Sequence, residues 1–154
     1  MENRLEVLRN EVDKLIFEKQ PGKVRYFIEH LYSVARYGSL LALKRKLNPE
    51  LAMTAGMLHD IYRVTHNTAK DHAVLGAKES AGILKGMGLY SDDEINIITS
   101  AITRHSDKAS VHTPYDEVLK DADVLSHCFY NPDFTIAAYE IERYKNLLDE
   151  LTLS

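Results

Sequence analysis

The sequence predicts an all-α fold, a compact bundle of about six or seven helices. Apolar residues recur at steps of three and four positions along most of the chain, which is the spacing of one face of an α-helix. The segments with this spacing are bounded by residues that cap or interrupt helices, among them Pro21-Gly22, Asn48-Pro49 and Ser91. No segment alternates apolar and polar residues as a half-buried strand does.

The composition is that of one soluble globular domain. A chain of 154 residues with 45% hydrophobic content is long enough to bury a core, so residues 1–154 are expected to form a single domain. The net charge of -4 gives no general basic character, so no nucleic acid partner is expected. The one cysteine, Cys128, excludes an internal disulfide and fits a reducing cytoplasm. The sequence shows no signal peptide and no apolar run that could span a membrane, so a cytoplasmic protein is expected.

The helices can be placed in order from the apolar spacing and the caps. They are expected at 2–19, 23–46, 48–60, 72–85, 94–105, from 113 onward and at 132–151. Asp71 is expected to cap the fourth of them, and Gly38 is expected to allow close packing of another helix. The polar stretches 65–71 and 106–113 are predicted to be loops.

Four polar residues occupy positions where a plain helical core would have apolar ones. His30 lies on the inward face of its helix, His59 and Asp60 end an apolar run, and Asp123 is surrounded by residues that should be buried. A buried carboxylate without a partner costs several kcal/mol, roughly, and a shared metal ion would supply the opposite charge. Taken singly, His30 also fits a hydrogen-bonded core histidine, and Asp123 a surface boundary. Mixed imidazole and carboxylate ligands suit iron, manganese or zinc.

The order of these residues resembles the HD-domain superfamily of metal-dependent phosphohydrolases. Three segments within residues 24–130 carry the resemblance: His30-Leu-Tyr-Ser-Val-Ala-Arg36, Leu58-His59-Asp60-Ile61 and Asp121-Ala-Asp123-Val-Leu125. The helices at 2–19 and 132–151 flank this region. The resemblance implies that His30, His59, Asp60 and Asp123 bind one metal ion, with Asp121 as a weaker candidate for the last position.

Two further segments are similar to those that bind a second metal in some members of the superfamily. They are Asp71-His72-Ala-Val-Leu-Gly-Ala77 and Thr103-Arg-His105-Ser106. The resemblance implies that His72 and His105 bind the second ion and that Asp60 bridges the two. His66 is an alternative to His72. A histidine at a helix C-terminus is also favourable on its own, which gives His105 a purely structural alternative.

Basic residues near these segments are candidates for phosphate binding. Arg63 stands where some members of the superfamily carry a phosphate-contacting lysine, and arginine suits bidentate binding of phosphate. Arg104 and Lys108 flank His105, where they either add positive charge to the site or are solvated. The two remaining histidines, His112 and His127, are expected in a loop and on the surface: neither is expected to bind metal.

The resemblance implies a metal-dependent phosphohydrolase that cleaves a phosphoester or phosphoanhydride. Asp60 and Arg63 are the expected catalytic residues. One or two divalent ions are the expected cofactor. The expected substrate is a small phosphorylated molecule, and a nucleotide is favoured. Two alternatives stay open: a di-iron oxygenase, in which Tyr26 would be of interest, and a non-catalytic domain that senses a nucleotide or a metal. A homodimer through the first or last helix is also left open, and no membrane partner is expected.

Overall fold

A computed structural model describes residues 3–131, 133 and 135–152, and these form helices and connecting loops without a strand. The elements are α1 (Arg4–Lys19), α2 (Val24–Lys44), α3 (Pro49–Leu58), α4 (Ile61–His66), α5 (His72–Met87), α6 (Asp92–Arg104), α7 (Pro114–Tyr130), the 3₁₀ helix η1 (Ala138–Glu140) and α8 (Ile141–Glu150). The predicted all-α fold is confirmed. Among the described residues no helix is long and apolar enough to cross a membrane.

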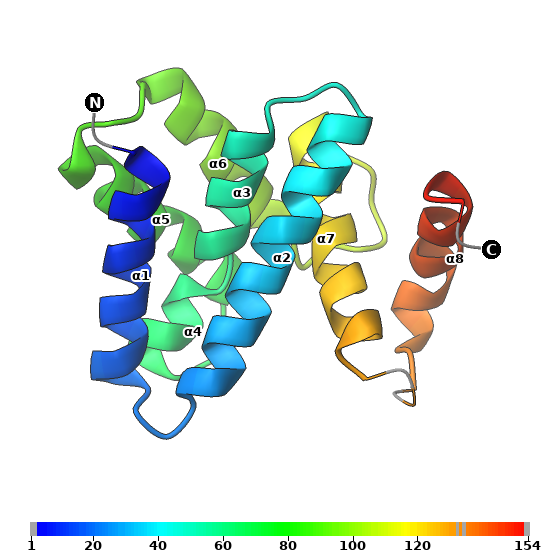
Figure 1. Ribbon diagram of the computed structural model, residues 1–154, viewed down its shortest axis with the longest axis horizontal. Coiled ribbons are helices and arrows are strands. Elements are labelled where there is room, and N and C mark those ends of the chain that lie inside the picture. Colours follow the sequence, from blue (N-terminus) through cyan, green and yellow to red (C-terminus); the bar gives the residue numbers. More distant parts are fainter. Residues whose placement is uncertain (1–2, 132, 134, 153–154) are drawn as a thin grey trace.

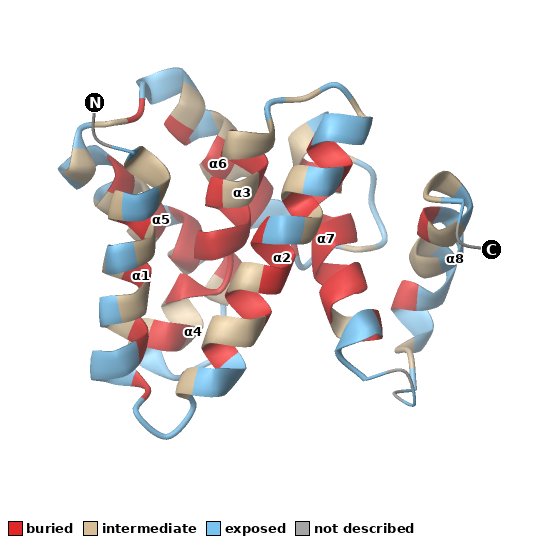
Figure 2. Cartoon of the chain, in the orientation of Figure 1, coloured by how far each residue is buried: buried red, intermediate tan, exposed pale blue. Residues whose placement is uncertain are grey.

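The helices form a bundle in which α2 and α3 lie together at the centre. Helix α7 packs on α2, α5 packs on α6, and α1 lies beside α4 (Figure 1). Buried residues gather on the facing sides of the central helices, whereas outward faces are exposed (Figure 2). Leu31, Leu58, Ile98 and Leu119, from four different helices, are all essentially inaccessible to solvent. Their burial supplies the main favourable term for folding.

Two helix starts carry the side-chain caps that the sequence predicts. The side chain of Asn48 accepts a hydrogen bond from the backbone N–H of Glu50 at 2.9 Å, and Ser91 forms a capping box with Glu94. Gly88 ends α5 in the left-handed conformation with φ of 65°, which glycine adopts without steric cost.

Four details differ from the sequence prediction. The short helix α4 was not predicted, because six residues offer too little apolar spacing to recognise. Asp71 precedes α5, but its side chain makes no capping hydrogen bond. Helix α5 continues to Met87, beyond the predicted end at residue 85. Helix α8 begins at Ile141, so the helix predicted at 132–151 starts later than expected. Two residues of the predicted helices, Glu2 and Pro132, lie outside the described residues.

Helices α2 and α3 approach each other at two glycines. A Cβ atom built on Gly56 would lie 2.6 Å from the Cα atom of Ala35, and one on Gly38 would lie 3.2 Å from the carbonyl oxygen of Ala52. Close packing at Gly38 agrees with the prediction, whereas the tighter contact at Gly56 was not foreseen. This approach brings the end of α3 next to the middle of α2.

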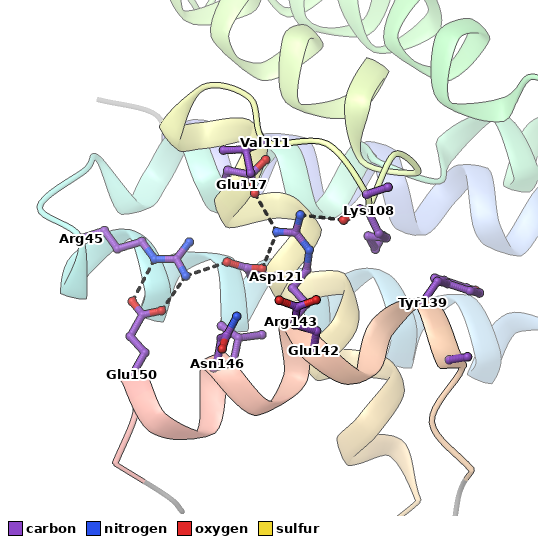
Figure 3. A pocket seen from close by; sticks show the side chains of 13 residues that line it. Arg45, Lys108, Val111, Glu117, Asp121, Tyr139, Glu142, Arg143, Asn146 and Glu150 are labelled. Carbon is purple, nitrogen blue, oxygen red and sulfur yellow. Dashed lines mark hydrogen bonds and ion pairs between the residues drawn. The ribbon is translucent and has the colours of Figure 1, made fainter.

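Ion pairs attach α8 to α7 and to the end of α2 (Figure 3). Arg143 donates to Glu117 at 2.7 Å and to Asp121 Oδ1 at 2.9 Å, while Arg45 donates to Asp121 Oδ2 at 2.6 Å and to Glu150 at 2.7 Å. Both oxygens of Asp121 are therefore bound by guanidinium groups. This carboxylate stabilises the position of α8.

Candidate metal centre

Six of the residues singled out in the sequence meet at one place where six helices converge. His30 comes from the middle of α2, His59 ends α3, Asp60 precedes α4, and the other three belong to α5, α6 and α7. These last three are His72, His105 and Asp123. All but His72 are buried. The structure thus brings together residues that lie up to 93 positions apart in the chain.

Backbone carbonyl groups fix the orientation of three of the imidazole rings. In His59, His72 and His105, Nδ1 lies 2.8, 2.8 and 2.7 Å from the carbonyl oxygen of the residue three positions earlier. A carbonyl oxygen only accepts hydrogen bonds, so Nδ1 carries the proton and Nε2 of each neutral ring presents its lone pair. This arrangement is typical of histidines that bind metals through Nε2.

The free ring nitrogens face one another in two pairs. Nε2 of His59 lies 3.1 Å from Nε2 of His30, and Nε2 of His72 lies 3.2 Å from Nε2 of His105. In the second pair both Nε2 atoms present lone pairs, which repel each other at such a distance unless a positive charge is shared between them. This pair therefore fits a cation better than it fits a packed core.

The carboxylate of Asp60 lies between the two pairs. Its Oδ2 atom is 3.5 Å from Nε2 of His30 and 3.6 Å from that of His59, while Oδ1 is 3.3 Å from Nε2 of His72 and 3.6 Å from that of His105. Oδ1 is buried and has no hydrogen-bond partner among the described residues. A buried carboxylate oxygen without a donor is costly, and a cation at that position would compensate for it. The donor set fits two neighbouring ions with Asp60 between them.

Asp123 completes the ligand set around the first pair. Its Oδ1 atom lies 3.5 Å from Nε2 of His30 and 3.7 Å from that of His59, and Oδ2 accepts a hydrogen bond from Lys108 at 2.7 Å. Burial alone would raise the pKa of Asp123, but the ammonium of Lys108 and nearby histidines hold it well below its usual range. Burial lowers the pKa of His59 to about 3, so this ring stays neutral and its lone pair stays available near neutral pH.

A cavity of about 280 Å³ opens beside the cluster, and two cations line it together with the carboxylates of Asp60, Asp123 and Glu140. Arg63 lines it and donates to Asp60 Oδ2 at 2.6 Å, and Lys108 lines it from the loop after α6. Tyr139 and Glu140 of η1 also reach this cavity. Two cations beside the candidate metal positions favour an anionic ligand such as phosphate.

Other candidates from the sequence lie away from the cluster. His66 is half-exposed at the end of α4 and faces Glu79, so the structure brings His72 rather than His66 to the centre. Arg104 is exposed, with its Nε atom 3.8 Å from Asp116. His112 is bound through Nδ1 by Lys120. Asp121 is occupied by the ion pairs that hold α8.

Sequence reasoning missed or misplaced several residues of the site. His127, expected on the surface and away from the metals, is stacked on His30 with ring centroids 5.3 Å apart. Its Nε2 atom lies 3.5 Å from Asp123, and Nδ1 donates to Glu140 at 3.0 Å. The spacing of four residues from Asp123 to His127 on one helix was the signal that could have found it. Glu140 carried no such signal, since it follows a loop after α7.

The second pair of histidines leads to a prediction about metal content. If His72, His105 and Asp60 hold a second ion, His105→Ala should lower the content of the reconstituted protein from about two ions per chain to about one. Elemental analysis after gel filtration measures this directly. His66→Ala is the matched control and should keep the wild-type content; circular dichroism checks that both variants are folded. Unchanged content in His105→Ala would contradict a second site at this position.

Comparison with known proteins agrees with this geometry. The sequence model of the family described as HD domain matches residues 27–127. An uncharacterised protein from Clostridium beijerinckii is 31% identical over 113 residues, covering 71% of this chain and 70% of the relative. Ribonuclease Y from Chlorobium luteolum is 33% identical over 99 residues, covering 64% of this chain. The chain spans about a fifth of the length of such ribonuclease Y relatives, 17% in that case and 20% for the enzyme from Chlorobium phaeovibrioides.

A solved structure has the same fold. The crystal structure of a predicted HD superfamily hydrolase from an uncultured Thermotogales bacterium superposes with a TM-score of 0.65 and covers 99% of this chain and 97% of the other. The two sequences are 23% identical, so the likeness concerns the fold.

Proposed function

The chain belongs to the HD domain family, and on that basis we propose that it is a metal-dependent phosphohydrolase acting on a small phosphorylated molecule, most simply a nucleotide. One observation carries the proposal: the carboxylate of Asp60 lies between two pairs of converging imidazole nitrogens, and its Oδ1 atom has no donor among the described residues. Together with the buried cluster, this supports the intact metal site of a hydrolase.

The roles of the ligands follow from their positions. His30, His59, Asp60 and Asp123 would hold one ion, and His72, His105 and Asp60 a second. When bound, such ions lower the pKa of a water molecule and polarise a phosphoryl oxygen. Iron, manganese and zinc all accept this mixture of nitrogen and oxygen ligands.

Cationic side chains complete the proposed site. Arg63 is held in place by Asp60, and its guanidinium group would bind the charge that develops on a phosphoryl group. Lys108 is almost fully buried and keeps Asp123 ionised and oriented. A cavity of about 280 Å³ is lined by these groups, and its volume suits a small substrate.

The substrate assay tests this function directly. The protein is reconstituted with manganese, iron or zinc. The substrates tested are bis(p-nitrophenyl) phosphate, nucleoside mono- and triphosphates, and short oligoribonucleotides. The oligoribonucleotides are included because several relatives are named ribonuclease Y. We expect metal-dependent hydrolysis of at least one nucleotide. Binding without turnover would indicate a sensor domain, and oxygen consumption a di-iron oxygenase. Either result, or no reaction from a folded, metal-loaded chain, would overturn the proposal.

Arg63 offers a separate test of phosphate binding. Arg63→Met should lower kcat/KM by about 100-fold, because removing a transition-state donor typically costs about 10²–10³ in rate. The steady-state kinetics are measured on the substrate found above. Arg104→Met removes an exposed arginine outside the site and should keep wild-type kinetics. Equal effects of the two substitutions would remove Arg63 from the mechanism.

A further inference from the structure

A second cavity, of about 270 Å³, adjoins the metal centre. His30 and His127 line both this cavity and the one beside the metal ligands, so the two spaces meet at these rings. The second cavity lies between α2 and α7. Its other lining residues are Tyr26, Glu29, Ser126 and Tyr130.

Aromatic rings dominate the walls of this cavity. Tyr26 and His30 are stacked with centroids 6.0 Å apart and planes 20° apart, and His30 and His127 are nearly parallel at 2°. Tyr130 adds a fourth ring from the end of α7. The two tyrosines are exposed to solvent by 46% and 58%, so their rings are accessible to a ligand. Planar walls of this kind suit a planar ligand that stacks on them.

Charge separates this cavity from the metal centre. Arg63 and Lys108 line the space beside the metals, and neither lines the aromatic cavity. Glu29 does line it, and within the described part of the chain its carboxylate makes no hydrogen bond and no ion pair. A carboxylate disfavours phosphate and favours N–H donors. One ligand that spans both spaces would therefore place its phosphate at the metals and a neutral, planar group beside Glu29.

We propose that the cavity between Tyr26 and Tyr130 binds the base of a nucleotide whose phosphate lies at the metal centre. The inference rests on the proposed function and adds to it the residues that select the substrate. Tyr130 lies outside the segment that matches the family, residues 27–127, and so does Tyr26, which immediately precedes it. The pair would contribute to the choice of base.

Calorimetry on the manganese-loaded protein tests the proposal without depending on turnover. The ligands are hydrolysis-resistant phosphonate analogues of AMP and of ribose 5-phosphate, which differ only in the base. The wild type should bind the AMP analogue about tenfold more tightly or better, since stacking contributes about 1–3 kcal/mol per base. Tyr130→Ala should abolish most of this difference, and Tyr130→Phe, which keeps the ring, should restore it.

A surface control and two contrary results complete the test. Phe17→Ala removes a ring of similar exposure on α1, outside both cavities, and should keep the wild-type ratio. Equal binding of both analogues by the wild type, or an unchanged ratio in Tyr130→Ala, would overturn the base site. So would tighter binding of phosphocholine, whose cation could stack on the same rings. If phosphoesters are still cleaved in these cases, only the base site fails; if none is cleaved, the proposed function fails as well.

Discussion

Replacing Asp60 with asparagine is expected to abolish both metal binding and hydrolysis. Each carboxylate oxygen of Asp60 faces one pair of histidines, and an amide offers one neutral oxygen in place of two that share a negative charge. The loss affects both metal positions at once. Because metal ions contribute several kcal/mol to transition-state stabilisation, kcat/KM should fall by about 1000-fold or more.

Metal content and thermal unfolding measure this loss independently of the substrate. A bound ion stabilises the folded state by mass action, so a chelator should lower the Tm of the wild type and leave that of Asp60→Asn unchanged. Asp121→Asn is the matched control, because Asp121 is paired with Arg45 and Arg143 instead of lying at the metals. It should retain the metal. Retention of wild-type metal content by Asp60→Asn would refute the bridging role.

The sequence predicted His30, His59, Asp60 and Asp123 as candidate metal ligands because these residues conflict with their helical surroundings, whereas the resemblance to the HD-domain superfamily supplied the other two. His30 interrupts an apolar face, and the pair His59-Asp60 ends an apolar run; these conflicts are visible without coordinates. The surrounding groups were harder to predict. Lys108 reaches Asp123 from a loop, and Glu140 reaches His127 after the chain has turned back from α7. Such contacts depend on tertiary placement, which the local pattern does not contain.

The helices themselves show the same division between local and long-range information. Caps such as Asn48 and Ser91 act within one turn, so the starts of α3 and α6 were predictable. The short helix α4 was not, because six residues are too few to show a repeating apolar face. The late start of α8 was not predicted either, because the proline at position 132 is also a residue type that starts helices. The tight crossing of α2 and α3 was also not predictable, because a glycine inside a helix can serve several structural purposes other than close packing.

That crossing leads to the largest expected effect on stability. Gly56→Ala would place a methyl group 2.6 Å from Cα and 2.7 Å from N of Ala35, which are backbone atoms and cannot rotate away. Helix α3 would have to move from α2, and overpacking of this kind costs about 1–3 kcal/mol and occasionally more. We expect a loss near the upper end, about 3 kcal/mol, in the free energy of unfolding measured by urea denaturation with a chelator present.

Gly82→Ala is expected to have the opposite effect on the free energy of unfolding in the same urea experiment. A Cβ atom on Gly82, in α5, would meet nothing within 4 Å, so alanine should stabilise the protein by about 0.5–1 kcal/mol through the lower entropy of the unfolded chain. If the two substitutions had similar effects, the close approach of α2 and α3 would be refuted.

Gly56→Ala should also weaken metal binding. This expectation links the packing of α2 against α3 to the candidate metal site. The carbonyl group of Gly56 accepts the Nδ1 proton of His59, and the spacing of the two helices sets the 3.1 Å between His59 Nε2 and His30 Nε2. Moving α3 away from α2 therefore changes the first metal position while leaving all of its ligands present. Titration with manganese should give a weaker first site in Gly56→Ala and an unchanged one in Gly82→Ala. A destabilised Gly56→Ala that binds manganese as the wild type does would show that the ligands adjust independently of the helix crossing.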